Sequence, residues 1–162
     1  MKKFATAFLL MAAFAVYAGY DLALDERASY WNITPEQAGK TVPGEEFFSI
    51  ALELSAGQTR TIAKSKLSYP VRLGDFLKVD TEIKGTGAAF VDAEILDITG
   101  NVIKTERLAS AKPFADRFSD MDGKIRIRRY KNAIPARVRI IIGIEPGSCV
   151  VFDDIEAELD ND

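Results

Sequence analysis

Apolar and polar residues alternate along most of the chain after Glu46. In the first such stretch the apolar side carries Phe48, Ile50, Leu52 and Leu54. A repeat of two residues is the period of a β-strand with one buried face, and no stretch keeps the 3.6-residue period of a substantial helix. The chain is therefore predicted to be all-β.

Turn signals rich in glycine separate the alternating stretches, and the tight turn at 99–101 predicts a hairpin. Strands are expected near 48–54, 59–69, 76–84, 88–98, 102–108, 124–130, 136–144 and 149–159. This many short strands indicates an antiparallel sandwich or a closed barrel. Because the strand lengths and connections are uneven, we expect a jelly-roll β-sandwich that forms a single domain over residues 19–162.

The absence of histidine excludes many kinds of catalytic site. Without imidazole there is no Ser-His-Asp or Cys-His relay and no histidine-ligated zinc. The single cysteine, Cys149, lies in an apolar strand and is expected to be a buried thiol, with an intermolecular disulfide as the alternative. The chain is therefore predicted not to be an enzyme.

The first 18 residues have the pattern of a secretory signal peptide. Two lysines precede a short, alanine-rich apolar run that ends at Ala18 after small residues. An N-terminal anchor helix is the alternative, although the run is short for a membrane span. Cleavage would change the net charge from −3 to −5, which gives no general reason to bind nucleic acid or an anionic membrane. We expect a secreted or periplasmic protein.

Several segments resemble a known family of β-sandwiches. The final strands at 130–144 and 147–159, which include Phe152-Asp153-Asp154-Ile155, are similar to the end of a galactose-binding-like domain. Residues 63–67 and 73–79 resemble the strand, glycine turn and strand of that family, and residues 22–31 loosely resemble its opening. The resemblance is closest to the carbohydrate-binding modules of bacterial xylanases and glucanases. It implies a jelly-roll sandwich, no catalysis and a structural Ca²⁺ ion.

Four carboxylates are candidates for that Ca²⁺ site. Strict alternation along the last strand places Asp153 on the apolar face, where an unpaired carboxylate is costly. The resemblance implies that Asp153 or Asp154 binds Ca²⁺ together with Asp25 or Glu26. In the alternative, Asp153 accepts backbone N–H bonds or pairs with an arginine.

Aromatic residues are candidates for sugar binding because the C–H faces of sugars stack on aromatic rings. Trp31, the only tryptophan, has Tyr30 and Asn32 beside it and could form a platform at a loop edge. The alternative places Trp31 in the core. Further candidates, on the outward phase of their strands, are Phe76, Phe90 and Tyr130.

Charged residues suggest two further sites. Arg126 and Arg128 share one strand face, and Arg137 and Arg139 share another, so two neighbouring strands could form a cationic stripe that binds carboxylated glycans. The alternative is a solvated face paired with nearby glutamates. A glycosidase pair formed by Asp92 and Glu94 is a weak candidate, because nothing in the sequence indicates a cleft or a raised pKa.

These features together predict an exported, non-catalytic β-sandwich module that binds a poly- or oligosaccharide. The alternative is a structural or adhesive protein-interaction module of the cell envelope with no sugar site. The partner is expected to be a carbohydrate or a cell-surface component.

Overall fold

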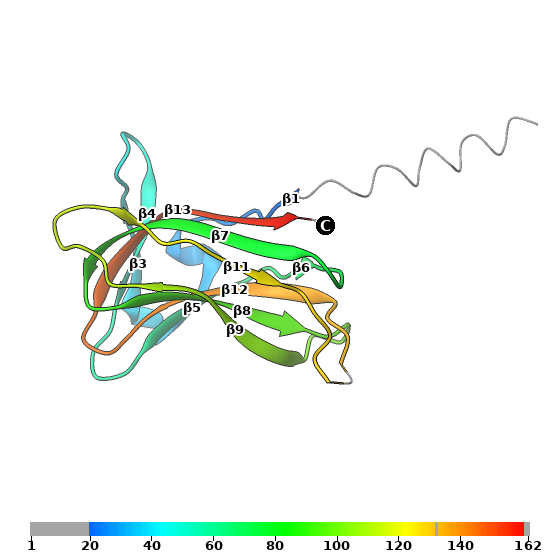
Figure 1. Cartoon of the computed structure of the whole chain (residues 1–162). Helices are drawn as coiled ribbons and strands as arrows, with labels where there is room; N and C mark the ends of the chain where they lie inside the picture. The colour runs from blue at the N-terminus through cyan, green and yellow to red at the C-terminus, as the bar shows by residue number, and fades with distance from the viewer. Residues whose placement is uncertain (1–19, 132, 161–162) are drawn as a thin grey trace, which may run out of the picture.

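Two antiparallel β-sheets face each other across an apolar core in the computed structural model, which describes residues 20–131 and 133–160 (Figure 1). The strands of sheet A are β1 (Tyr20–Asp21), β3 (Gly39–Pro43), β4 (Ile50–Ser55), β7 (Phe76–Thr86), β10 (Ser119–Asp120), β11 (Gly123–Arg126) and β13 (Cys149–Asp160). The strands of sheet B are β2 (Trp31–Thr34), β5 (Thr61–Ser65), β6 (Tyr69–Pro70), β8 (Ala89–Leu96), β9 (Val102–Ala111) and β12 (Arg137–Ile144). Two short 3₁₀ turns, η1 (Ala28–Tyr30) and η2 (Glu36–Ala38), flank β2.

Most neighbouring strands in the two sheets come from segments that are distant in sequence, whereas the β3–β4 and β8–β9 pairs are consecutive in the chain. Sheet A runs β10-β7-β13-β4-β3, with β11 also paired to β7 and β1 paired to β13. Sheet B runs β2-β5-β12-β8-β9, with β6 paired to β12. Figure 1 shows β7 and β13 of sheet A lying above β8, β9 and β12 of sheet B. The prediction of an all-β antiparallel sandwich is confirmed.

Period-2 patterning decides which side chains enter the core. On β7 the side chains of Leu77, Val79 and Ile83 are buried, while Lys78 and Asp80 between them face outward. On β12 the same alternation buries a row of valine and isoleucine side chains. Each sheet therefore presents one apolar face to the other sheet, as its sequence pattern predicts.

The last strand does not keep a single phase. Val150 and Phe152 point into the core at its start, and Ile155 and Ala157 do so further along. A β-bulge between Asp153 and Glu156 shifts the register with β7 and exchanges the two faces. Strict alternation, which predicts Cys149 on the inner face, is therefore wrong before the bulge, and the Cys149 thiol is exposed.

The first strand predicted by alternation also begins later than the sequence suggests. The β3–β4 connection occupies residues 44–49, and β4 begins at Ile50. Phe48 is therefore a loop residue and is 90% exposed, whereas Leu52 and Leu54 are fully buried as predicted.

Trp31 lies in the core at the start of β2 and is 3% exposed. Its indole Nε1 donates a hydrogen bond to the carbonyl oxygen of Asp25 at 2.7 Å. The ring of Tyr30 packs edge-on against it, with ring centroids 5.4 Å apart. The hydroxyl groups of Tyr30 and Tyr69 lie 2.6 Å apart and both donate to the carbonyl oxygen of Ala23. The ring of Trp31 is thus covered on all sides, and its prediction as a surface sugar platform is corrected to the core alternative.

The predicted signal peptide at 1–18 lies outside the described residues and stays a prediction. Among the residues that are described, no helix is long and apolar enough to cross a membrane.

Replacing Trp31 by alanine is expected to lower the free energy of unfolding by about 3–5 kcal/mol, as truncation of a large core side chain does. Urea denaturation measures the change, and Leu67→Ala at an exposed position is the control. Because Trp31 is the only tryptophan, the fluorescence of the native protein should be blue-shifted relative to free tryptophan. Emission like that of free tryptophan, or equal losses of stability in the two variants, would place the ring at the surface instead.

Candidate functional site

An open groove of about 660 Å³ runs across the outer face of sheet A. Its floor carries outward side chains of β7 and β13, namely Lys78, Asp80, Glu156 and Glu158. Residues 21–24 with Glu26 line one side, residues 122–124 line the other, and Asp154 lies beside Glu156 at the bulge. We call this feature the sheet A groove. Its volume falls in the range of small-molecule sites, about 300–1,000 Å³.

The sheet A groove is strongly acidic. Seven carboxylates and two lysines line it. Lys78 lies 3.7 Å from Glu158 and also pairs with Asp160, which keeps the pKa of the Asp160 carboxyl below its usual value and that of Lys78 above it. The positive charge at this end of the groove is therefore neutralised, and the carboxylates at the opposite end determine its electrostatic character.

Acidic groups also gather where the groove approaches the β3–β4 connection. The pKa of the Glu82 carboxyl on β7 is raised, and partial burial is the largest cause. The neighbouring carboxyls of Glu45, Asp120 and Asp154 raise the pKa of Glu82 further. Glu45 belongs to the β3–β4 connection and Asp154 lines the groove, so Glu82 lies between the two features.

Phe76, a predicted sugar platform, lies at the start of β7 opposite Arg126 of β11. The Nζ atom of Lys124 lies 3.9 Å from the centroid of the Phe76 ring, and the Cζ atom of Arg126 lies 5.4 Å from it. Two cations therefore cover the ring. Phe76 borders the groove through Lys124, which is itself a lining residue.

Arg128 and Tyr130 form a separate group in the segment that joins the two sheets. The Nη2 atom of Arg128 lies 3.2 Å from Oε1 of Glu106 on β9, and its Cζ atom lies 5.9 Å from the Tyr130 ring centroid. Burial, followed by the charge of Glu106, raises the pKa of Tyr130. This group is not part of the sheet A groove.

Phe90 lies on the outer face of sheet B but is 1% exposed, so its prediction as an open platform is wrong. Its ring packs over Gly143 of the neighbouring strand, where an added Cβ would come within 2.3 Å of the ring. The Cζ atoms of Arg60 and Arg107 lie 5.0 and 4.2 Å from the Phe90 ring centroid. The two guanidinium groups thus close the ring off from solvent.

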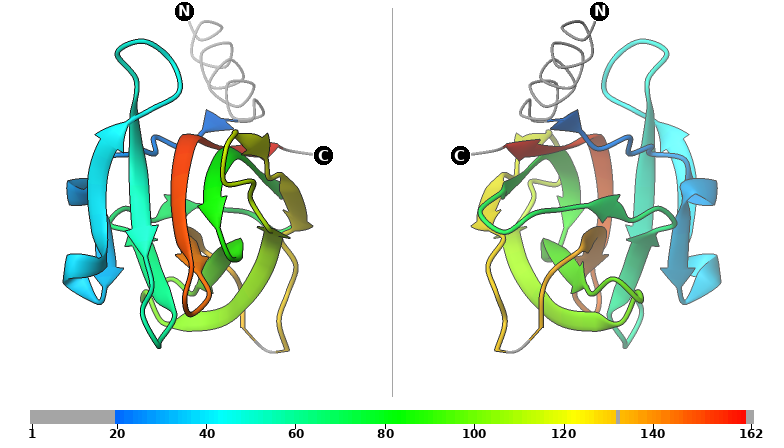
Figure 2. Two further views of the ribbon diagram at one scale, coloured as in Figure 1. Left: turned by 90° about the vertical axis from the view of Figure 1, so that its left-hand side faces the viewer. Right: turned by 90° about the vertical axis from the view of Figure 1, so that its right-hand side faces the viewer.

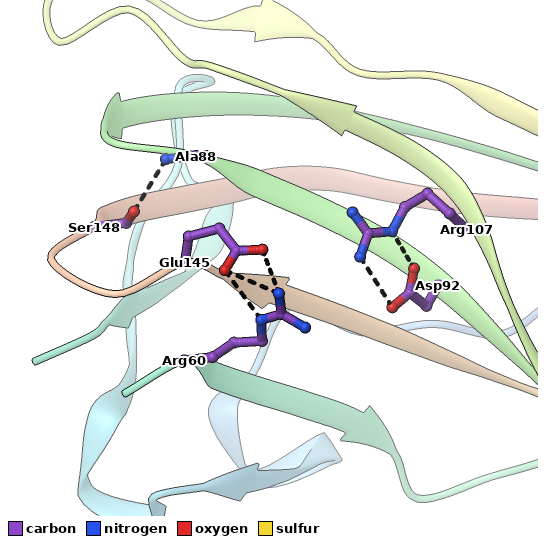
Figure 3. A network of polar contacts seen from close by, with 6 residues as sticks. All are labelled: Arg60, Ala88, Asp92, Arg107, Glu145 and Ser148. Carbon is purple, nitrogen blue, oxygen red and sulfur yellow. Dashed lines mark hydrogen bonds and ion pairs between the residues drawn. The ribbon is translucent and has the colours of Figure 1, made fainter. Parts of the chain in front are cut away.

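Both of these arginines are held by carboxylates, as Figure 3 shows. Arg60 makes a bidentate ion pair with Glu145, with an Nη2–Oε1 distance of 2.6 Å. Arg107 pairs with Asp92 of the adjacent strand. An arginine held in this way keeps a fixed orientation, which favours a permanent cover over Phe90.

The predicted cationic stripe is not formed, because its two halves lie on different sheets. Arg126 belongs to sheet A, whereas Arg137 and Arg139 belong to sheet B. Arg139 pairs with Glu94 at 2.5 Å, and Arg137 donates hydrogen bonds to Ser68. Arg137 and Arg139 are therefore engaged within the protein rather than aligned for an acidic ligand.

The same ion pairs argue against a glycosidase pair at Asp92 and Glu94. Glu94 is 4% exposed, and burial alone would raise its pKa. The hydrogen bonds from Lys64 and Arg139 outweigh burial and lower the pKa of Glu94 below its usual value. A general acid in glycoside hydrolysis needs a raised pKa, so this pair does not meet the requirement.

The four carboxylates proposed for Ca²⁺ do not fit the ion that the resemblance implies. Both oxygens of Asp153 accept backbone N–H groups, from Glu45 at 2.6 Å and from Asp154 at 3.1 Å. Glu26 accepts the backbone N–H of Ile155, and Asp25 accepts that of Arg27. Within residues 20–131 and 133–160, no group of three or more acidic, cysteine or histidine side chains is placed to hold a metal. Ca²⁺ takes six to eight oxygen ligands, which these separately engaged groups do not offer.

The exposed pair Phe47 and Phe48 was missed by the sequence patterns. They lie in the β3–β4 connection, 89% and 90% exposed, with ring centroids 4.1 Å apart. Strict alternation places Phe48 in the core phase of the following strand. The Pro43-Gly44 dipeptide, which is a turn signal, and two adjacent phenylalanines that cannot share one strand face could have identified this loop.

The sandwich resembles several solved structures at low sequence identity. It superposes on the CBM22-1 xylan-binding domain of Paenibacillus barcinonensis Xyn10C with a TM-score of 0.62 and 11% identity, covering 91% of this chain and 99% of that domain. It also superposes on the CBM22-1-GH10 modules of Clostridium thermocellum xylanase 10B, in complex with xylohexaose, with a TM-score of 0.58 and 15% identity, covering 85% of this chain and 28% of that one. A cyclase from Fischerella sp. TAU gives a TM-score of 0.55 at 10% identity, over 74% of this chain and 68% of the cyclase.

These likenesses establish the fold, which is the β-sandwich of carbohydrate-binding modules of the kind found in xylanases. No protein-family profile and no curated protein sequence matches the chain.

Asp153→Ala is expected to destabilise the protein by about 1–3 kcal/mol, because it leaves the backbone N–H of Glu45 without its buried acceptor. The neighbouring, exposed Asp154→Asn is the control and should change the free energy of unfolding by less than about 0.5 kcal/mol. Urea denaturation measures both. A loss of stability in the control as large as that in Asp153→Ala would contradict the role assigned to Asp153.

The melting temperature is expected to be the same in excess Ca²⁺ and in excess chelator, because the four candidate carboxylates do not form a donor set. A ligand that binds only the folded state raises the melting temperature, so differential scanning calorimetry reports binding directly. A reproducible increase with Ca²⁺, but not with Mg²⁺, would restore the calcium site that the sequence resemblance implies.

Proposed function

We propose that this chain is a non-catalytic carbohydrate-binding module, and that a chain of sugar residues lies along the sheet A groove. The observation that carries the proposal is the groove itself, a partly open depression of about 660 Å³ on the outer face of a β-sandwich. A groove open to solvent admits a segment of a longer polymer, which a closed cavity does not.

The lining of the groove suits the hydroxyl groups of sugars. Its carboxylates accept hydrogen bonds from sugar O–H groups, and its lysines donate hydrogen bonds to sugar oxygens. Asp80 and Glu156, opposite each other on paired strands, are both exposed in the groove. The fold that the chain shares with xylan-binding domains supports the same class of ligand.

The proposal includes export, with residues 1–18 as a cleaved signal peptide. A secreted or periplasmic protein meets polysaccharides of cell walls and extracellular matrices, which matches a glycan ligand.

The test is calorimetric titration of the protein with neutral hexasaccharides, xylohexaose and cellohexaose, and affinity electrophoresis in gels that contain xylan or β-glucan. Calorimetry is chosen because the buried Trp31 is not expected to report binding. We expect at least one of these glycans to bind. Binding should be weakened about tenfold or more in the double variant Asp80→Ala/Glu156→Ala, because truncation of central contacts typically costs more than about 1 kcal/mol.

Glu36→Ala, an exposed carboxylate outside the groove, is the control and should bind as the wild type does. No heat and no gel retardation with any of these glycans would contradict the proposed function. Equal binding by the groove variant and the control would contradict the assignment of the groove.

A further inference from the structure

The most exposed apolar side chains among the described residues form a pair at the tip of the β3–β4 connection. Phe47 and Phe48 are 89% and 90% exposed, and their rings contact each other with centroids 4.1 Å apart and planes tilted by 54°. Figures 1 and 2 show this connection rising above the layer formed by sheet A. Two adjacent, fully exposed aromatic rings are unusual on a folded domain and indicate a contact surface.

The loop that carries the pair has a defined conformation. The backbone N–H of Gly44 donates to the carbonyl oxygen of Ser49 at 3.1 Å, and the N–H and Oγ of Ser49 donate to that of Glu46 at 3.1 and 2.9 Å. Phe48 has a φ of 71°, in the left-handed region that bulky residues rarely occupy. A strained backbone held by this many bonds fixes the direction in which the rings project.

The same loop is tied directly to the end of the sheet A groove. The buried Asp153 accepts the backbone N–H of Glu45 at 2.6 Å, and the next residue, Asp154, lines the groove. Glu82 is near both Glu45 and Asp154, since the charges of both raise its pKa. The aromatic tip therefore projects beside one end of the groove.

The size of the tip favours a small ligand. Two phenylalanine side chains bury about 300–500 Å² together when covered, whereas a stable protein partner covers about 800 Å² on each side. One or two sugar rings match the area that two phenyl rings offer.

The charge of the loop argues against a lipid surface. Glu45 and Glu46 precede the two phenylalanines, and residues 44–49 contain no lysine or arginine. Loops that enter anionic membranes generally use basic residues beside their aromatic side chains. Carboxylates beside an aromatic face suit sugars, which combine apolar C–H faces with hydroxyl donors.

We infer that Phe47 and Phe48 form the stacking platform for one end of a glycan chain whose other sugar residues lie in the sheet A groove. This inference rests on the proposed function and adds the aromatic contact that the sheet faces lack, since the rings of Phe76 and Phe90 are covered by cations. It also specifies the class of glycan. The seven carboxylates of the groove repel uronate chains, so the ligand is uncharged.

The test compares binding of xylotriose, xylohexaose, cellohexaose and hexagalacturonate by calorimetry. Wild type is compared with Phe47→Ala/Phe48→Ala and with Ile98→Ala, an equally apolar control that is 84% exposed in the β8–β9 turn of sheet B. Because the rings make few contacts with the rest of the chain, the double variant should melt at the wild-type temperature.

A neutral hexasaccharide should bind wild type and Ile98→Ala equally and the double variant about tenfold more weakly, a typical loss for a central aromatic contact. The double variant should lose less affinity for the trisaccharide, which is too short to span both the groove and the tip. Tryptophan in place of alanine at position 47 of the double variant, which gives Phe47→Trp/Phe48→Ala, should restore binding. The emission of this second, exposed tryptophan should shift when the hexasaccharide is added.

Unchanged hexasaccharide binding by the double variant would overturn this inference while the proposed function stands. No glycan binding by wild type would overturn both. Tighter binding of hexagalacturonate than of the neutral hexasaccharides would overturn the assignment of ligand class. Binding of wild type, but not of the double variant, to phosphatidylglycerol vesicles without glycan binding would identify the tip as a membrane contact instead.

Discussion

The β-bulge between Asp153 and Glu156 is the constraint on which the proposed binding surface depends. β13 is the central strand of sheet A, and the bulge exchanges its inward and outward faces partway along. Before the bulge Phe152 fills the core, and after it Ile155 and the residues that follow in its phase do so. The bulge turns the Asp153 carboxylate toward the β3–β4 connection and leaves Asp154 and Glu156 outside, in the sheet A groove. One irregularity thus joins the core, the groove and the aromatic tip.

The two outer sheet faces differ in how far their polar groups are already satisfied. On sheet B the side chains of Arg60, Arg107 and Arg139 pair with carboxylates, and Arg60 and Arg107 also cover Phe90, so a ligand would have to break existing contacts. On sheet A the groove keeps exposed carboxylates such as Asp80 and Glu156. Binding costs less free energy where no internal partner has to be displaced, which is why we assign the ligand to sheet A.

The sequence predicts the sandwich because alternation is a local property. The row on β7 alternates without interruption, so its buried face follows directly from the residue order. The site is harder to predict, since it depends on events that local patterns do not encode. Nothing in the residues around Asp153 indicates a bulge, and strict alternation therefore misplaces Cys149. The cations that cover Phe76 and Phe90 come from other strands, so the residue pattern along a single strand does not reveal them.

The location of the glycan site is tested most directly by mapping the backbone amide NMR shifts of the ¹⁵N-labelled protein during titration with xylohexaose and cellohexaose. We predict that the largest shifts cluster on 78–80, 154–158 and 45–48, which form the groove and the aromatic tip on one side of the molecule. Shifts centred on β8 and β12 around Phe90, or no shifts at saturating glycan, would contradict the assignment of the glycan site to the sheet A groove and the aromatic tip.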